Sequence, residues 1–313
     1  GTAVSARPGG FCPACDKPLP ATPAIRGRDR LHGIPGEFVV HVCDWCGSGR
    51  TLPHVAAERL GELYPSSYNA FGLPAKAALR AAATALFRWR YWRGLRRPPL
   101  AELSPRAPGR LLDVGSGRGD LGLVLRGHGW QVTGVEPSRE ACDKANARGA
   151  PTVHGTLAIA SSRLDGNFDA VVFQHSLEHV AEPLEDVRLA AERLRPGGLL
   201  LVSLPNFGSW QAQRFGSNWF HLDLPRHRSH FTARGIDLLL RRAGLNPLRT
   251  STSTSADGLP MSIEYRLFGE RRFGSGFPLY ASMAVTLAVS PLTALADRAA
   301  GAGDILHAVS LQP

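Results

Sequence analysis

The sequence has no apolar leader and few cysteines. Its first 20 residues carry prolines and cysteines where a secretory signal would have a hydrophobic run, so we expect a cytoplasmic protein. The chain contains five cysteines among 313 residues. In a reducing compartment, paired cysteines are metal ligands more often than disulfides.

Acidic residues are in the minority. The chain has 36 lysines and arginines against 26 aspartates and glutamates, which gives a formal net charge of +10. A positive charge fits an acidic partner such as nucleic acid or anionic lipid. The excess is largely arginine, however, and a GC-rich genome produces the same bias. Charge alone therefore does not choose a partner.

An uninterrupted hydrophobic run is also missing. Residues 277–296 contain no charge and are long enough to span a membrane, but Pro278 and Pro291 interrupt them. Residues 305–311 then have the pattern of a further strand of a soluble sheet, and a chain that returns to such a sheet cannot leave across a bilayer. We expect an apolar helical insertion over about 262–300. It would serve as a helical lid, a dimer face or a hairpin peripheral to the membrane.

Four of the five cysteines form two C-x2-C pairs. Cys12 and Cys15 are followed, after 27 residues, by Cys43 and Cys46. Each pair bends around a turn so that two thiolates face one ion, and two pairs complete a tetrahedral site with four sulfur ligands. Because four cysteines leave no open coordination position, we expect a structural zinc and no catalytic metal at this site.

Composition divides the chain into three expected parts: a zinc ribbon over 1–50, a helical connector over 51–108 and an α/β domain over 109–313. In the connector, residues 64–71 have the aromatic and small residues of a substrate-facing or domain-joining loop. Residues 76–97 predict a helix with seven basic residues and no acidic one. Such a helix either lies on an anionic membrane surface or presents a solvated arginine face.

From residue 109 onward, segments with strand and helix patterns alternate. This alternation predicts a Rossmann-like, doubly wound α/β fold, in which a mainly parallel sheet carries helices on both faces. In such folds the ligand lies at the carboxyl ends of the strands. We expect strands at 110–114, 130–135, 151–154, 169–173, 198–204 and 305–311, and helices at about 120–128, 138–148, 183–194 and 232–243.

Three glycines at alternate positions follow the first of these strands. Gly115, Gly117 and Gly119 would let a cofactor lie against bare backbone, and the helix after them presents free N–H groups. A dinucleotide fingerprint would place its third small residue at position 120, where Asp120 stands instead. The spacing therefore does not favour a dinucleotide.

Two carboxylates indicate what binds there. Asp113 ends the first strand, where it would repel a pyrophosphate and attract an ammonium group. Glu136 ends the second strand, close to the interval at which such folds place a ribose-binding acid. We expect a ligand with a ribose and a positive or zwitterionic tail.

At these residues the chain resembles the class I S-adenosylmethionine-dependent methyltransferases. The segment from Asp113 to Gly119 looks like their first motif and Glu136 like their ribose acid. The resemblance continues through residues 168–180 and 194–206 and covers about 109–250. It implies S-adenosylmethionine as cofactor and a mainly parallel seven-stranded sheet, in which residues 305–311 look like the final, antiparallel strand. The cofactor-binding residues that it implies are Asp113, Gly115, Ser116, Gly117, Gly119, Glu136, Pro137, Gln174 and His175.

The paired cysteines extend this resemblance. A group of bacterial methyltransferases joins an N-terminal cysteine ribbon to this domain, and it includes sugar C-methyltransferases and enzymes of natural-product and cell-surface glycan pathways. The resemblance implies an acceptor that is a small molecule or a lipid-linked metabolite. Whether carbon, oxygen or nitrogen is methylated does not follow from it.

Histidines near the strand ends are the candidate bases. Methyl transfer from a sulfonium is an in-line displacement, for which the protein mainly positions the reactants. Whether it also uses a general base to remove a proton does not follow from the sequence. His175 follows the fourth strand directly. His227 lies in residues 206–231, a polar and aromatic stretch that we expect to cap the strand ends. Both are candidate catalytic residues; for His227, a structural or substrate-orienting role is the alternative, and His179 is expected to belong to a helix-start network.

Two other function classes remain as alternatives. A nucleic-acid methyltransferase would use the ribbon and the basic helix, but base-methylating enzymes have an Asn/Asp-Pro-Pro-Tyr/Phe element after the fourth strand. Residues 174–176 read Gln-His-Ser instead, so nucleic acid is the less favoured partner. A non-catalytic cofactor-binding scaffold is disfavoured because Asp113, Gly115, Gly117 and Glu136 are all intact.

Overall fold

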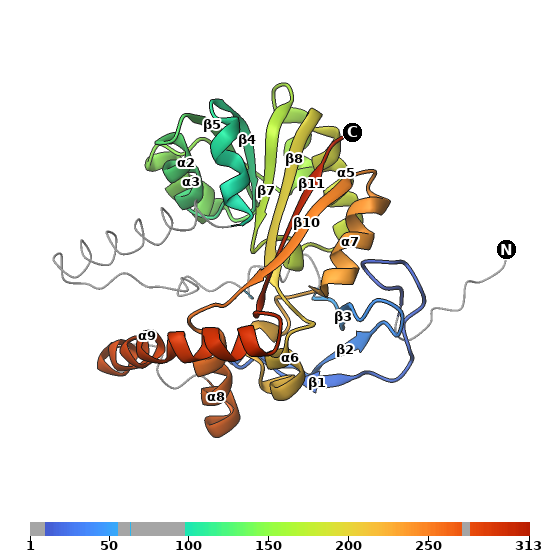
Figure 1. Ribbon diagram of the computed structural model, residues 1–313, viewed down its shortest axis with the longest axis vertical. Coiled ribbons are helices and arrows are strands. Elements are labelled where there is room, and N and C mark those ends of the chain that lie inside the picture. Colours follow the sequence, from blue (N-terminus) through green and yellow to red (C-terminus); the bar gives the residue numbers. More distant parts are fainter. Residues whose placement is uncertain (1–9, 56–62, 64–97, 271–275) are drawn as a thin grey trace.

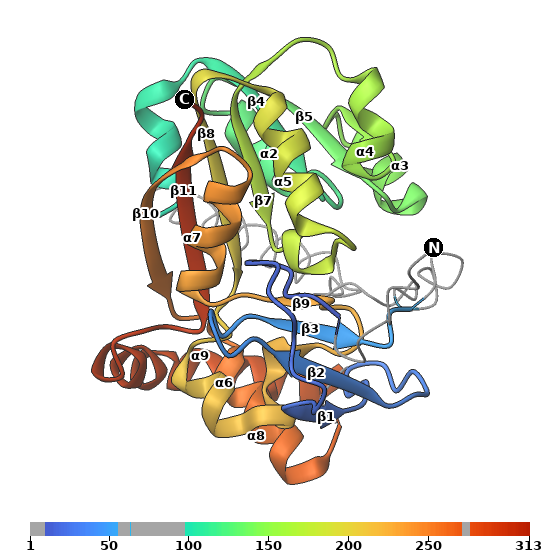
Figure 2. The same ribbon diagram turned by 90° about the vertical axis from the view of Figure 1, so that its right-hand side faces the viewer.

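The computed structural model describes residues 10–55, 63, 98–270 and 276–313. They form two β-sheets, one of seven strands and one of four. Figures 1 and 2 show the small sheet beyond one end of the large one, with helices beside it. The helix expected over 76–97 and the loop expected over 64–71 lie outside the described residues.

The large sheet confirms the expected fold class. Its seven strands are β4 (Gly109–Val114), β5 (Trp130–Glu136), β6 (Thr152–His154), β7 (Phe168–Gln174), β8 (Leu194–Pro205), β10 (Asn246–Ser253) and β11 (Ile305–Leu311). Their order is β10-β11-β8-β7-β4-β5-β6. The run from β8 to β6 is parallel, whereas β11 is antiparallel to both of its neighbours. Ile305 pairs with Pro205 and Leu311 with Leu199, so the antiparallel strand expected over 305–311 is confirmed.

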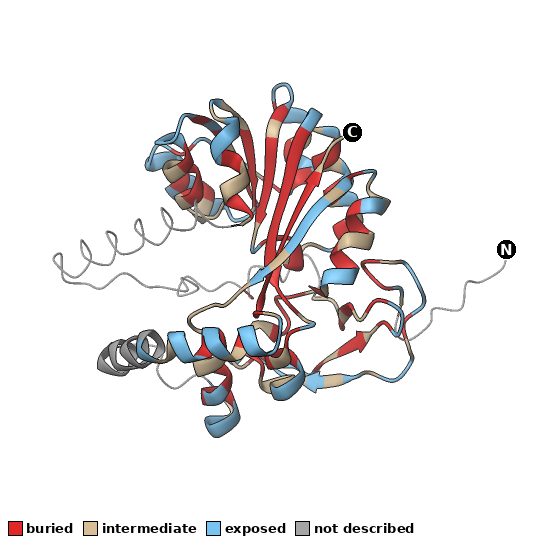
Figure 3. Ribbon diagram, viewed as in Figure 1, coloured by how far each residue is buried: buried red, intermediate tan, exposed pale blue. Residues whose placement is uncertain are grey.

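Helices cover both faces of this sheet. They are α2 (Asp120–Arg126), α3 (Arg139–Ala147), α4 (Leu157–Ala160), α5 (Pro183–Glu192), α7 (Ala233–Arg242) and the 3-10 segments η2 (Leu100–Arg106), η3 (Ser161–Arg163) and η4 (Leu177–His179). Successive strand residues point to opposite faces. Leu111 accordingly packs with η2 and α2, while Leu112 packs with α4, α5 and α7. Figure 3 shows the central strands buried and the helix surfaces exposed.

The small sheet joins two distant parts of the chain. Strands β1 (Ile25–Gly27), β2 (Phe38–Val42) and β3 (Gly49–Leu52) come from the ribbon, and β9 (Ser229–His230) comes from the expected cap. Val40 of β2 shares a buried apolar cluster with Trp219 and Leu224 of the cap. Ribbon and cap therefore pack together as one unit at the carboxyl ends of the parallel strands (Figure 2).

Further helices lie within or beside the ribbon and the cap, beyond the carboxyl ends of the parallel strands. They are α6 (Trp210–Phe215), η5 (Gly216–Asn218), η6 (Phe220–Leu222), α8 (Gly258–Phe268) and α9 (Gly276–Ala299). Helices α8 and α9 occupy the segment in which an apolar helical insertion was expected (Figure 1). Among the described residues, none of the helices combines the length and the apolar character that crossing a bilayer requires.

Two details of the sequence analysis were wrong. The helix expected over 183–194 ends at Glu192, and the strand expected at 198–204 begins earlier, at Leu194, so that Gly197 and Gly198 both lie inside β8. Gly197 has a φ of +77° near the point where the register between β7 and β8 shifts. Strand β10 was not expected, because this edge strand is polar and largely exposed, and so lacks the hydrophobic signal of a buried strand.

Candidate active site

The glycine loop after β4 leaves room for a ligand only at its middle glycine. Gly115, Gly117 and Gly119 have φ values of +76°, +55° and +74°, which favour glycine. A Cβ atom at Gly115 would collide with Ser176, and one at Gly119 would collide with Ala150. A Cβ atom at Gly117 would meet nothing within 4 Å among the described residues. The loop is therefore packed at both ends and open at Gly117, where a ligand can approach the backbone.

The carboxylate of Glu136 is fixed beside this opening. Its Oε2 accepts a hydrogen bond from the backbone N–H of Gly117 (2.8 Å), and its Oε1 accepts one from the N–H of Ser138 (2.8 Å). Burial raises the pKa of Glu136, and these two N–H groups partly oppose that shift. Each oxygen keeps one further acceptor position. This geometry suits a diol, as expected for a ribose-binding acid.

Asp113 lies under the loop. Its side chain is 2% exposed, and together with Ser116 it lines a small cavity between α2 and β5. Burial and the nearby charge of Glu136 raise the pKa of Asp113 to about 7. A positive charge bound above the loop would favour its ionised form. Ser116 also has its hydroxyl oxygen buried without a hydrogen-bond partner in the described part of the chain.

The end of β7 provides the other side of the opening. The side-chain oxygen of Gln174 is buried and accepts no hydrogen bond from any described residue. His175 has a φ of +53°, and its backbone N–H donates to Ser203 O (2.8 Å). Its imidazole is 42% exposed, with Nδ1 3.6 Å from Glu178 Oε1. The end of β7 therefore places two groups beside the glycine loop: the Gln174 oxygen, which has no partner among the described residues, and the accessible His175 imidazole.

A buried carboxylate and two imidazoles lie behind His175. Glu178 is 2% exposed, and neither of its side-chain oxygens has a hydrogen-bond partner in the residues described. Burial would raise the pKa of Glu178, but His175, His179 and His227 lower it to about 2. The rings of His179 and His227 meet edge to face, with centroids 4.6 Å apart. Glu178 is thus ionised at neutral pH and surrounded by imidazoles.

His227 is less accessible than a general base requires. It is 7% exposed, and its Nδ1 donates to the carbonyl of His221 (2.8 Å). Burial, with the charge of His179, lowers the pKa of His227 to about 4. The ring is therefore neutral at pH 7, with its proton on Nδ1. Its Nε2 lies 3.9 Å from Glu178 Oε1, so the structure brings the two sequence-predicted histidines to the same carboxylate.

A buried ionic network holds the cap against the ribbon. Arg226 is 1% exposed. It donates to both Asp29 (2.7 Å and 3.0 Å) and Asp223 (2.6 to 3.0 Å). Asp29 also accepts the backbone N–H groups of Leu31, His32 and Ile34. Sequence reasoning missed this network, because Asp29 and Arg226 are 197 residues apart and nothing local marks them as partners.

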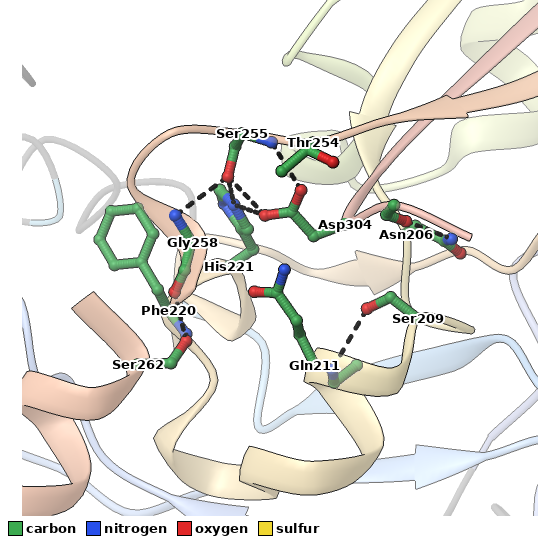
Figure 4. A network of polar contacts seen from close by, with 12 residues as sticks. Asn206, Ser209, Gln211, Phe220, His221, Thr254, Ser255, Gly258, Ser262 and Asp304 are labelled. Carbon is green, nitrogen blue, oxygen red and sulfur yellow. Dashed lines mark hydrogen bonds and ion pairs between the residues drawn. The ribbon is translucent and has the colours of Figure 1, made fainter. Parts of the chain in front are cut away.

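A second network ties the cap to Asp304, the residue that directly precedes β11 (Figure 4). Asp304 accepts hydrogen bonds from Ser255 N (2.7 Å), Ser255 Oγ and His221 Nε2 (3.1 Å). Burial would raise the pKa of Asp304, but these partners lower it. The same carboxylate raises the pKa of His221 against the opposing effect of burial. Nε2 of His221 contacts both Ser255 Oγ and Asp304 Oδ2, each at 3.1 Å. Because the same ring nitrogen makes both contacts, the ring does not connect two groups for proton transfer, and the cluster anchors the cap.

The four paired cysteines converge in space. Cys12 Sγ lies 3.4 Å from Cys46 Sγ, and Cys15 Sγ lies 3.5 Å from Cys43 Sγ. All four sulfur atoms lie within 4.8 Å of one another. Sulfur atoms bound to one tetrahedral zinc at about 2.3 Å stand about 3.8 Å apart, so the cluster fits a single zinc ion. Thr232, the N-cap of α7, donates to the carbonyl of Cys46 (2.6 Å) and so joins the cluster to the large domain.

Comparison with known proteins shows the family to which the chain is similar. Residues 87–250 match a family described as "Methyltransferase domain". A ubiquinone biosynthesis O-methyltransferase from Cereibacter sphaeroides is 30% identical over 182 residues, which cover 52% of this chain and 74% of that protein. A protein of the same name from Xanthomonas oryzae is 31% identical over 134 residues, with coverages of 40% and 56%. A SAM-dependent methyltransferase structure from Archaeoglobus fulgidus has a TM-score of 0.48 and 16% identity, covering 73% of this chain and 99% of that one.

Proposed function

The chain belongs to the methyltransferase-domain family and is an S-adenosylmethionine-dependent methyltransferase, and we propose that its acceptor is a small molecule or a lipid-linked metabolite. The observation that carries this proposal is the exposed His175 imidazole at the carboxyl end of β7, backed by the buried Glu178 carboxylate 3.6 Å away. The names of the relatives, which describe O-methyltransferases, support a hydroxyl as the accepting group.

The cofactor would lie over the glycine loop. S-adenosylmethionine supplies a methyl group on a positively charged sulfur. Glu136 would accept hydrogen bonds from both ribose hydroxyls, since its carboxylate is already oriented by Gly117 and Ser138. Gln174 would use its unpartnered oxygen to accept a hydrogen bond from the bound cofactor. We assign the remaining contacts to Asp113, Gly115, Ser116, Gly119, Pro137 and His175.

His175 is the better placed of the two candidate bases. Its Nδ1 faces Glu178, which leaves Nε2 for the acceptor hydroxyl. A carboxylate beside one ring nitrogen stabilises the imidazolium that forms when the other nitrogen takes a proton. His227 is buried and has its pKa lowered to about 4, so it is a weak base. We therefore assign proton removal to His175 and a positioning role to His227.

Exposed apolar residues near the cap support a lipid-linked acceptor. Leu267 at the end of α8 is 68% exposed, and Leu292 and Leu295 of α9 are 66% and 60% exposed. Both helices lie at the same end of the molecule as the cap (Figure 1). A prenyl or acyl tail leaving the site would find apolar surface here.

The acceptor class can be tested with methyl-labelled S-adenosylmethionine. The purified protein is offered simple phenols and catechols, the same head groups carrying a prenyl tail, and total RNA and DNA. We expect label in the small-molecule or lipid fraction. Label confined to nucleic acid would overturn the proposal, and would favour the alternative based on the ribbon and the basic segment.

The role of His175 can be tested with the acceptor found in this way. Loss of a general base lowers turnover by about 10²–10⁴-fold. We expect this loss in His175→Ala, with a much smaller effect on cofactor affinity measured by calorimetry. The exposed His128 provides a matched control, and His128→Ala should be fully active. Full activity of His175→Ala, together with loss of activity in His227→Ala, would transfer the role to His227.

We also propose that Cys12, Cys15, Cys43 and Cys46 hold one structural zinc. The closed set of four sulfur atoms leaves no position for substrate, so the ion would stabilise the ribbon alone. Elemental analysis of reduced protein should give one zinc at this site. Cys43→Ser should release that zinc, whereas Cys142→Ser, which changes a cysteine buried elsewhere, should retain it. A metal-free wild-type ribbon that is equally stable would contradict the proposal.

A further inference from the structure

Glu178, His179 and His227 form a cluster that is separate from the cysteine site. One donor atom from each of the three residues lies within 4.8 Å of the other two. Glu178 and His179 belong to η4, directly after the fourth parallel strand, and His227 comes from the cap. The cluster therefore forms only where the cap closes on the strand ends, behind the imidazole that we assign to proton removal.

Two of the three residues in this cluster, Glu178 and His227, direct possible ligand atoms toward each other. Both oxygens of Glu178 are buried and accept no hydrogen bond within the described chain. Nδ1 of His227 is taken up as a donor to a carbonyl oxygen, so Nε2 is the ring nitrogen left for a ligand. This Nε2 lies 3.9 Å from Glu178 Oε1. A buried carboxylate and an imidazole nitrogen placed in this way leave a position that a cation would satisfy.

The distances suit a metal ion. Two donors that each lie about 2.1 Å from one ion are about 3.0 Å apart when adjacent in an octahedron and about 4.2 Å apart when opposite. The separation of 3.9 Å falls within this interval, and the 4.8 Å limit for the whole set requires only a small contraction. Two imidazoles and one carboxylate form a donor set that zinc and iron(II) sites share.

The surroundings already orient the donors. His179 donates from Nδ1 to the carbonyl of Arg226 (3.1 Å), and His227 does so to the carbonyl of His221 (2.8 Å). Metal-bound histidines use the other ring nitrogen in this manner, which fixes the ring and its tautomer. The backbone N–H of Arg228 donates to Glu178 O (2.8 Å), so the cap holds the cluster at both ends. Asp223 is nearby, but its carboxylate is already paired with Arg226.

We propose that Glu178, His179 and His227 bind one divalent transition-metal ion in a site separate from the four cysteines. Three protein ligands leave coordination positions open. Resting on the proposed function, we infer that an oxygen of the acceptor occupies one of them, beside His175. The ion would then hold the acceptor and ease removal of its proton.

Cobalt(II) is a suitable probe because its visible spectrum reports the ligands. Protein that keeps zinc at the cysteines is freed of loosely bound metal and titrated with cobalt chloride. We expect one cobalt per chain, with weak bands and no thiolate charge-transfer absorption. Glu178→Gln and His227→Ala should each weaken binding by at least about tenfold, the scale of losses seen at metal sites. The exposed Glu185 and His128 provide matched controls, and Glu185→Gln and His128→Ala should bind as wild type.

Several results would overturn the site. These are the absence of cobalt binding to the wild type, equal binding in Glu178→Gln and His227→Ala, or thiolate bands that disappear in Cys43→Ser. Thermal melting and S-adenosylmethionine affinity show whether each variant is folded, and His179→Gln serves as a third variant if one of the others is not. Failure of the proposed function has a different signature. The wild type would bind cobalt but would methylate no small-molecule or lipid-linked acceptor.

Discussion

Replacing Glu136 tests the cofactor site most directly. Its carboxylate accepts hydrogen bonds from Gly117 N and Ser138 N, both at 2.8 Å, and has two acceptor positions left for the ribose. Glu136→Ala removes those two positions and also frees the two backbone N–H groups. Glu136→Gln is not a mild change either, because its NH2 group must face one of the two backbone N–H donors. We expect both variants to bind the cofactor poorly.

The size of the effect follows from the bonds lost. A hydrogen bond to a charged group contributes about 1.5–3 kcal/mol, and the two ribose bonds share one carboxylate, so we take the loss as about this range in total. A loss of about 1.4 kcal/mol corresponds to a tenfold change in affinity. Glu136→Ala should therefore raise the dissociation constant of S-adenosylmethionine by about 10- to 150-fold.

Titration calorimetry can measure this with two ligands. S-adenosylhomocysteine has the same ribose but no positive sulfur, so the Glu136 variants should lose the same factor for both ligands. Glu140→Ala, on the exposed face of α3, provides the control and should bind as wild type. An unchanged dissociation constant in folded Glu136→Ala would refute the assignment. A loss restricted to the charged ligand would show that Glu136 acts through charge and does not hold the ribose.

Two further variants test the buried charges. The pKa of Asp113 is raised from 3.8 to about 7 in the folded chain, so wild-type stability should fall as the pH rises through this window. Asp113→Asn should therefore raise the melting temperature at pH 8 and change it little near pH 4; a shift of equal size at both values would contradict the raised pKa. Arg226→Ala leaves Asp29 and Asp223 buried without their counter-ion, which costs about 3–5 kcal/mol. Urea denaturation should show this loss, with Arg241→Ala, at an exposed ion pair, unchanged; a stable Arg226→Ala would show that the network does not hold the cap.

The sequence was sufficient for the parts of the fold that local patterns determine. The alternation of strands and helices predicted the parallel sheet. In such a sheet helices cover both faces, so each central strand is buried on both sides and appears in the sequence as a continuous apolar run. Three glycines with positive φ were predictable from their spacing, since few other residues tolerate that backbone. The cysteine pairs were also predictable, because the two cysteines of each pair are close enough in sequence to share one turn.

Long-range pairings could not be predicted in this way. Strand β9 has only two residues and no strand pattern, and it exists because β3 offers it a partner. The Asp29–Arg226 pair links the ribbon to the cap across 197 residues. His179 was expected in a helix-start network, but nothing in the sequence marks its neighbour Glu178, whose side-chain oxygens have no hydrogen-bond partner in the described part of the chain. Local sequence carries no record of which surfaces will meet.

The joining of ribbon and cap explains why a closed cysteine site can matter for chemistry that it does not touch. Thr51 of β3 donates to the carbonyl of His227 (2.7 Å) and shares a hydrogen bond with His230 Nε2 (2.8 Å). The strand that leaves the second cysteine pair thus holds the backbone of the histidine that faces Glu178. A loosened ribbon would release His227 before it disturbed the glycine loop, which belongs to the other sheet. Acceptor positioning should therefore depend on the ribbon, whereas cofactor binding should depend on the ends of β4, β5 and β7, which belong to the large sheet.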